Sequence, residues 1–396
     1  MIIERPIYLE RLIASRHNGM IKIITGVRRC GKSFLLSKLY ADWLQKQGVD
    51  EAHIITVNLE DRRNKSLRDP DALLAHIDSQ INDKKVHYIM IDEIQHVPEF
   101  EDVLNSYLNM ENADVYVTGS NAKFLSKDVI TTFRGRGYEI KVHPLSYKEY
   151  LPISGLSPVM ALREHMTYGG LPQAVLMEKK ELKIEFLKEL FQHTYMRDVL
   201  ERYKIKNNEV LEELLNILAS GIGALTNPTK LAHTFESVKH EKVSNKTISA
   251  YLEYLCDSFI MERASRYDIK GKKYIESPYK YYFIDEGLRN ARLNFRQIEY
   301  THLLENLIYN ELRILGFNVD VGVVPIQRTV EGKRERVQLE VDFVCNLGSR
   351  RYYIQSVYKM PDEEKFKQEE NSLRNIDDSF KKIIIVGEEM PLLHTE

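Results

Sequence analysis

The sequence predicts an α/β protein in which residues 1–155 form a five-stranded parallel sheet. Nearly uninterrupted apolar runs alternate with helical patterns, and a glycine-rich loop separates the first run from the first helical pattern. Strand, helix and strand in this order indicate crossover connections and therefore parallel strands. The five runs are IKIITGV (21–27), HIITVNL (53–59), HYIMID (87–92), DVYVTGS (114–120) and YEIKVHP (138–144).

The glycine-rich loop GVRRCGKS matches the pattern G-x-x-x-x-G-K-[ST] and opens the helical pattern at 32–47. Gly26 and Gly31 let the backbone turn its N–H groups toward a phosphate, and the helix N-terminus adds its dipole. Lys32 is expected to reach the β- and γ-phosphates of ATP, and Ser33 to bind Mg²⁺. The residues predicted to bind the nucleotide are Gly26, Val27, Arg28, Arg29, Cys30, Gly31, Lys32, Ser33 and Phe34.

Two carboxylates, Asp92 and Glu93, end the third apolar run. The carboxyl ends of the strands are where an open α/β sheet places its ligand. Asp92 is expected to hold Mg²⁺ through water together with Ser33, and Glu93 to polarise the water that attacks ATP. An isolated Asp-Glu pair is commonly a solvated turn. The preceding buried run and the glycine-rich loop favour the functional interpretation.

The fourth run ends in polar residues, Thr118, Ser120 and Asn121. A polar side chain here is expected to sense the γ-phosphate or to orient the attacking water, and Asn121 is the residue we select. The alternative is a strand-to-helix turn in which Ser120 or Asn121 caps the helix.

Two arginines, Arg134 and Arg136, precede the fifth run in FRGRGYEI. An arginine that reaches the γ-phosphate of a neighbouring subunit stabilises the charge of the transition state. We select Arg136 for a finger or sensor role, and action within one chain stays open. The alternative is a pair of surface arginines. Because a finger acting between subunits requires neighbours, a homo-oligomer is left open.

The composition, with 43% hydrophobic and 29% charged residues, is that of an ordinary globular protein. The net charge of −2 means that any binding to nucleic acid must come from a local patch. Three widely separated cysteines argue against a disulfide framework. The charged start MIIERPIYLERL does not resemble a signal peptide, and the apolar stretches are too short to span a membrane. A cytoplasmic location without a membrane partner is expected.

The rest of the chain has three regions with different sequence patterns. Residues 156–207 carry long amphipathic patterns and are expected to be a helical lid or linker. Residues 208–280 read as helix, turn, helix and hairpin, a winged-helix-like domain. Lysines and arginines between 239 and 273 are expected to contact DNA phosphates. Docking of a protein partner and a lid within the ATPase are the alternatives. Residues 281–396 are expected to be a mixed α/β domain.

These motifs together resemble a known family. The loop GVRRCGKS, the acid strand YIMIDEIQHV, and the runs TGSNAKFLS, FRGRGYEIKVHPLSYKEYL, YGGLPQAV and EVDFV…YIQ are similar to prokaryotic AAA+-type P-loop ATPases that carry an uncharacterised nuclease-like C-terminal domain. The resemblance covers nearly the whole chain. It implies an ATPase core with an extra strand between the loop strand and the acid strand.

The C-terminal part resembles the PD-(D/E)xK nuclease layout through Glu305, Asp342 and Gln355. In active nucleases with this layout, an acid or glutamine is followed two residues later by a lysine. Together these residues bind Mg²⁺ and position an activated water. Here Val357 stands at the lysine position, and Lys359 follows one strand repeat away, roughly 7 Å. We therefore expect a nuclease-shaped domain without cleavage activity.

The function expected from these motifs is that of an ATP-hydrolysing conformational switch that acts on a nucleic-acid or protein partner. Two alternatives stay open at this point. The first is an ATP-dependent, metal-requiring nuclease that uses the C-terminal domain. The second is a regulator that binds ATP without hydrolysing it.

Overall fold

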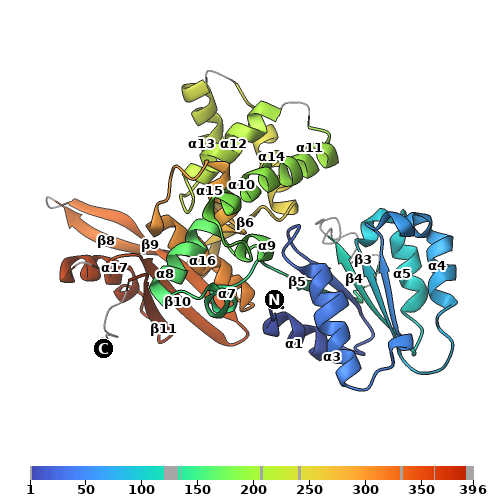
Figure 1. Ribbon diagram of the computed structural model, residues 1–396. Helices are drawn as coiled ribbons and strands as arrows, with labels where there is room; N and C mark the ends of the chain where they lie inside the picture. Colours follow the sequence, from blue (N-terminus) through green and yellow to red (C-terminus); the bar gives the residue numbers. More distant parts are fainter. Residues whose placement is uncertain are drawn as a thin grey trace. The chain divides into compact units, whose positions relative to one another are not determined.

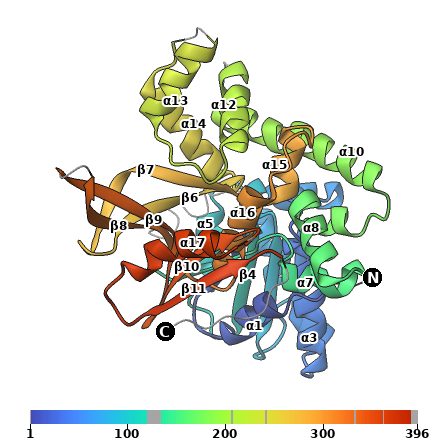
Figure 2. The ribbon, with the colours of Figure 1, turned by 90° about the vertical axis from the view of Figure 1, so that its left-hand side faces the viewer.

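A computed structural model of the chain describes residues 2–119, 133, 135–205, 208–239, 242–330, 333–360 and 362–388. Ser120, Asn121 and Arg134 lie outside the described residues. The chain divides into two compact units, one formed by Met1–Pro144 with Asp257–Phe259 and the other by Leu145–Cys256 with Ile260–Glu396. Figures 1 and 2 show the ribbon of each unit in two views. The finer division into four domains stays a prediction.

The first unit contains a five-stranded sheet, as far as its residues are described, with strand order β2-β3-β4-β1-β5. Every pairing in it is parallel, and β4 lies between the loop strand β1 and the acid strand β3. The predicted fold class is therefore confirmed, including the extra strand. The strands are β1 (Ile21–Thr25), β2 (Ile54–Asn58), β3 (His87–Asp92), β4 (Ala113–Gly119) and β5 (Gly137–Lys141).

Helices cover both faces of this sheet, which explains why its strands are apolar on both sides. Figure 1 shows α4 and α5 on one side and α1 and α3 on the other. Ile89 and Ile91 pack with residues of α4 and α5, whereas Tyr116 on the opposite face bonds through its hydroxyl to Tyr40 at 2.6 Å. The helices are α1 (Pro6–Ala14), α2 (Lys32–Phe34), α3 (Ala41–Lys46), α4 (Pro70–Asp78) and α5 (Phe100–Tyr107), with a π-helical stretch, Leu35–Tyr40, joining α2 to α3.

The second unit begins with the helices α7 to α14, and α15 follows its first two strands. Within the amphipathic stretch 156–207, residues 180–203 form one continuous helical path, because α10 passes through the π-helical stretch Phe191–Met196 into α11. The helices are α7 (Tyr147–Ser154), α8 (Pro158–Tyr168), α9 (Pro172–Val175), α10 (Lys180–Leu190), α11 (Arg197–Tyr203), α12 (Asn208–Ser220), α13 (Pro228–Thr234), α14 (Asn245–Asp257) and α15 (Glu286–Arg292).

A six-stranded mixed sheet, counted over the described residues, completes the second unit in the order β11-β10-β9-β8-β6-β7. One face packs against α16 (Tyr300–Ile314), and the other against Leu373 of α17 (Glu363–Arg374). The strands are β6 (Met261–Asp268), β7 (Lys273–Phe283), β8 (Asn318–Val330), β9 (Lys333–Leu347), β10 (Arg350–Val357) and β11 (Lys381–Val386).

The hairpin expected to be a wing after α14 is part of this C-terminal sheet. Its first strand, β6, pairs in parallel with β8, and its second strand, β7, runs past residue 280 to Phe283. The predicted boundary between 280 and 281 therefore passes through a continuous strand. Parallel pairing with a strand about fifty residues downstream is a long-range contact, which local sequence patterns do not reveal.

Candidate nucleotide-binding site

The glycine-rich loop leaves the carboxyl end of β1 and enters α2. Its backbone adopts positive φ angles at Gly26 (139°), Arg29 (64°) and Gly31 (99°). A Cβ atom on Gly26 would lie 2.1 Å from the carbonyl oxygen of Val142, so this position admits only glycine. Such conformations turn successive N–H groups toward one point, which is the geometry of a phosphate cradle.

Lys32 lies inside this loop. Its side chain is buried, and its Nζ donates hydrogen bonds to the carbonyl oxygens of Gly26 at 3.0 Å and Val27 at 3.1 Å. These acceptors are neutral, so a phosphate oxygen would be a stronger partner for the ammonium group. A phosphate bound in the loop can therefore replace these two carbonyls as the partner of the Lys32 ammonium group.

A buried arginine that the sequence interpretation missed anchors the loop. Arg5, just before α1, donates from Nη1 to the carbonyl oxygen of Cys30 at 2.9 Å and from Nη2 to that of His143 at 2.7 Å. The loop is thereby tied to the segment that follows β5. No local pattern marks Arg5, because its partners lie 25 and 138 residues away in the sequence.

Ser33 and Asp92 meet at the carboxyl edge of the sheet. The Ser33 hydroxyl donates to Asp92 Oδ1 at 2.9 Å, and the Thr118 hydroxyl donates to the same oxygen. Burial raises the pKa of Asp92, and these two hydroxyl bonds oppose that shift. A hydroxyl beside a carboxylate is an oxygen-ligand set of the kind that Mg²⁺ binds together with water and phosphate. The residues therefore fit the metal predicted from the sequence.

Thr118 also connects Asp92 to Glu93. Its Oγ1 accepts a hydrogen bond from the backbone N–H of Glu93 at 3.0 Å. Glu93 is buried and has a left-handed backbone with φ of 55°, and its carboxylate accepts a hydrogen bond from Gln95 Nε2. A left-handed conformation in a residue other than glycine costs of order 1–3 kcal/mol, so the surrounding contacts must hold it.

The structure does not bring Arg136 to the site of its own chain. Its backbone carbonyl accepts from the N–H of Ile21 at 2.9 Å, at the amino end of β1, and its guanidinium donates to Asn109 at 3.2 Å. The loop leaves the other end of β1, about 13 Å away at the strand rise per residue.

Two predicted nucleotide-binding residues lie at the surface of the loop. Arg28 pairs with Glu60 at 3.3 Å, and the Phe34 side chain is exposed.

Two known proteins are similar to this chain over most of its length. An uncharacterized protein of Haemophilus influenzae is 33% identical over 392 residues, covering 98% of this chain and 94% of that protein. An uncharacterized protein of Methanocaldococcus jannaschii is 30% identical over 388 residues, covering 93% of this chain and 82% of that protein. This chain belongs to their family. Residues 18–151 match the AAA domain, and residues 160–299 match a domain of unknown function (DUF8612).

Solved structures similar to the chain include the Aeropyrum pernix ORC2 protein, with a TM-score of 0.41, 11% identity, and 78% of this chain and 92% of that chain covered. The Aeropyrum pernix ORC1 protein in complex with DNA has a TM-score of 0.32 at 13% identity, with 74% and 92% covered. Within the parts of the chain that the structure describes, no helix is both long and apolar enough to cross a bilayer.

Outside the AAA domain, the second unit gathers the acids expected from the nuclease layout. Glu305 lies on α16 and accepts hydrogen bonds from Lys280 Nζ at 2.8 Å and from the Tyr282 hydroxyl at 2.7 Å. Lys280 also pairs with Glu340 at 2.8 Å. This lysine comes from β7 and is buried, so a protein cation lies among the acids.

The strand residues of this acid group are also engaged within the protein. Asp342 accepts hydrogen bonds from the backbone N–H of Ser356 at 2.8 Å and from its hydroxyl at 2.7 Å. Burial, with the charge of Glu305 next in size, raises the pKa of Asp342 to about 7. Gln355 accepts from the Asp342 N–H at 3.3 Å, and Lys359 pairs with Glu388 at 3.2 Å.

Proposed function

We propose that the AAA domain binds ATP with Mg²⁺ in the loop Gly26–Phe34 and hydrolyses it, and that turnover switches the conformation of the chain on a nucleic-acid or protein partner. The observation that carries this proposal is the continuous set of contacts from Ser33 through Asp92 and Thr118 to Glu93. It links the loop, the acid strand and the strand between them. A structural turn would not require a hydroxyl, two carboxylates and a lysine at one sheet edge.

Each residue has a defined part in this proposal. Lys32 exchanges its loop carbonyls for phosphate oxygens, and the loop N–H groups hold the phosphate chain. Ser33 and Asp92 hold Mg²⁺, which when bound neutralises charge on the phosphate oxygens. Glu93 takes up the proton of the attacking water, and Gln95 and Thr118 are positioning residues that fix its carboxylate and backbone.

The test begins with Lys32→Ala, measured by fluorescent-nucleotide binding and by phosphate release. We expect ATP binding and turnover both to be lost. Lys38→Ala is the matched control, because Lys38 follows on the same helical path, is half exposed and pairs only with Asp42 across one turn at 3.2 Å among its recorded ion pairs. Unchanged turnover in Lys32→Ala would refute the proposal. Binding without any phosphate release in the native protein would instead favour the non-hydrolytic regulator.

We propose that Arg136 acts on the nucleotide of a neighbouring chain. Arg136 lies at the amino edge of the sheet, away from the loop of its own chain, so a finger role requires the loop of another chain. Arg136→Ala and Lys32→Ala should each be inactive alone, and mixing them should restore turnover, because the mixture offers intact loops beside intact arginines. Native turnover by Arg136→Ala alone at every protein concentration would exclude a finger role.

We propose DNA as one candidate partner, through the basic residues between 239 and 273. Lys272 and Lys273 at the β6–β7 turn are exposed, whereas Lys270 pairs with Asp377 at 3.4 Å and Arg263 stacks on the ring of Tyr279. Binding to duplex DNA should weaken with salt and with a Lys272→Glu, Lys273→Glu double substitution. Binding that is unchanged in this variant would favour a protein partner.

The pairing of Lys280 with Glu305 and Glu340 favours a structural role for the acid group of the second unit over cleavage. We expect no cutting of plasmid or single-stranded DNA with Mg²⁺ or Mn²⁺. Cleavage that Asp342→Ala abolishes would establish the nuclease alternative.

A further inference from the structure

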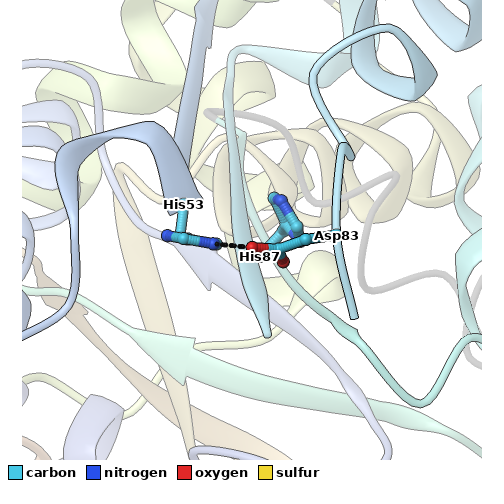
Figure 3. A group of neighbouring side chains, drawn as sticks. All are labelled: His53, Asp83 and His87. Atoms are coloured by element: carbon cyan, nitrogen blue, oxygen red, sulfur yellow. Dashed lines mark hydrogen bonds and ion pairs between the residues drawn. The ribbon is translucent and has the colours of Figure 1, made fainter. Parts of the chain in front are cut away.

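Three side chains gather at the edge of the AAA sheet that lies opposite Asp92. His53 immediately precedes β2, His87 is the first residue of β3, and Asp83 lies in the connection from α4 to β3. The two strands are paired in parallel with Ile54 opposite Tyr88, so the two histidines are neighbours. One nitrogen of each ring and one oxygen of Asp83 lie within 4.8 Å of one another (Figure 3).

The hydrogen bonding of His87 leaves one ring nitrogen available. Its Nδ1 lies 2.9 Å from the carbonyl oxygen of Lys85, which can only accept, so Nδ1 carries the proton. In the neutral ring Nε2 then has a free lone pair. His87 is fully buried, and its Nε2 has no hydrogen-bond partner among the described residues. A buried acceptor without a partner is uncommon and needs an explanation.

The arrangement of His87 is the one that metal-binding histidines show. A ligating imidazole commonly donates its other N–H to a backbone carbonyl, which sets the tautomer and orients the ring. In His87 the backbone carbonyl of Lys85 is the acceptor of this N–H. The alternative, in which His87 is an ordinary core residue, leaves Nε2 unexplained.

The distances are compatible with a metal ion. Bonds of about 2.0–2.1 Å in a tetrahedral zinc site place ligand atoms about 3.3 Å apart. His53 Nε2 and Asp83 Oδ2 are joined by a hydrogen bond of 3.0 Å, whose proton a metal ion would displace. All the ligand atoms lie within 4.8 Å of one another, so no pair has to close by more than about 1.5 Å. The Asp83 side chain is 40% exposed, so water can enter from its side as a fourth ligand.

We propose that His53, Asp83 and His87 bind a divalent transition metal ion, of which Zn²⁺ fits two imidazoles and a carboxylate best. The ion joins the starts of β2 and β3 to the α4–β3 connection. This site contains none of the residues assigned to nucleotide binding, and its presence or absence is independent of ATP hydrolysis.

The experiment uses the full-length protein, stripped with a chelator and free of nucleotide. Co²⁺ is titrated by its visible absorption, and Zn²⁺ by competition with a chromophoric chelator. We expect one equivalent of each, a tetrahedral Co²⁺ spectrum and a higher Tm with Zn²⁺. Asp83→Asn should weaken binding at least 10-fold. Asp83 is exposed, so this variant should fold, and its circular dichroism spectrum reports that it has.

Two further variants make the result decisive. His87→Gln should weaken binding as Asp83→Asn does, whereas His76→Gln should bind as the native protein, because His76 is exposed on α4 and bonds only to Gln80 among the recorded side-chain contacts. The proposal is overturned if the native protein binds no ion stoichiometrically. It is equally overturned if affinity is the same in Asp83→Asn and in the native protein, since the ion then lies elsewhere, for example at Ser33 and Asp92.

Discussion

The AAA domain and the second unit each bring carboxylates together at a sheet, but they balance the charge differently. Asp92 is held by the hydroxyls of Ser33 and Thr118, and the nearby Lys32 ammonium is bound by loop carbonyls. In the second unit the buried Lys280 pairs with Glu305 and Glu340. A group of acids that already contains a protein cation is satisfied without a metal ion. Acids held by hydroxyls keep a charge that a metal ion can balance.

The largest expected effect tests the chemistry of the first group. Glu93→Gln keeps the size of the side chain but removes the base, so phosphate release should fall on the order of 10²–10⁴-fold. ATP binding should persist, because the loop and Lys32 are intact. Glu111→Gln, an exposed glutamate in the turn before β4, is the control and should turn over normally. If both variants release phosphate at the same rate, Glu93 is not the catalytic base, and the acids of the first unit have no chemical role that those of the second unit lack.

The second prediction tests the ion pairs of the second unit. Lys280→Met leaves Glu305 and Glu340 without their cation, and breaking a buried pair in this way costs about 3–5 kcal/mol. Urea unfolding measures this loss in the free energy of unfolding. Adding Glu305→Gln to Lys280→Met should recover part of it, because one uncompensated charge is removed. Lys273→Met, at the exposed start of the same strand, should change little. A cost below about 1 kcal/mol for Lys280→Met would show that solvent screens these charges.

Much of the AAA domain was predictable because its signals are local. The five strands are consecutive apolar runs, and the loop carries its own pattern, so β1 to β5 and the positions of Ser33, Asp92 and Glu93 follow from short segments. That Thr118 bonds to Asp92 depends only on β4 lying beside β3.

The rest depends on contacts that no short segment contains. Lys280 reaches Glu305 from a strand assigned in advance to a separate hairpin, and Arg5 reaches His143 across most of the first unit. Arg136 comes before the fifth strand in the sequence, so its place at the amino edge, away from the loop, could have been inferred from the order of the strands. His53 and His87 become neighbours only when β2 and β3 are in register.

The third prediction uses the buried acids of the second unit. Burial, and after it the charge of Asp285, raises the pKa of Glu286 to about 8, and burial raises that of Glu311 to about 7. Between the ordinary pKa and these values the folded state holds protons that the unfolded state has released. Stability therefore falls as pH rises and becomes level above about 8.

This pH dependence is measured by thermal unfolding between pH 7.5 and 8.5. In this range His165, whose pKa burial lowers to about 4, is neutral in the folded state and almost wholly neutral in the unfolded state, so it does not oppose the trend. We expect a loss on the order of 1 kcal/mol. Glu286→Gln should flatten the profile, because its amide oxygen can still accept from Asn306 and Asn310 without ionising. The exposed Glu276→Gln should leave the slope unchanged. A rising profile in the native protein would contradict the assignment.

The smallest expected effects come from removing a helix N-cap in each unit. They show which unit unfolds in a given thermal transition. Ser146 caps α7 by accepting from the Glu149 N–H at 3.2 Å, and Asp69 caps α4 by accepting from the Ala72 N–H at 3.0 Å. Replacing either by alanine should cost about 1 kcal/mol. Ser157→Ala is the matched control, since Ser157 begins α8 without a capping bond from its side chain.

Each cap belongs to one unit, so Ser146→Ala should shift only the transition of the second unit, and Asp69→Ala only that of the first unit. Calorimetry with and without ATP makes the distinction visible, because a ligand of the AAA domain raises that transition alone. If both substitutions lower one common transition by the same amount, the units unfold together. The cost of Lys280→Met would then be a property of the whole chain, and only the turnover of Glu93→Gln would still separate the metal-binding acids from the ion-paired ones.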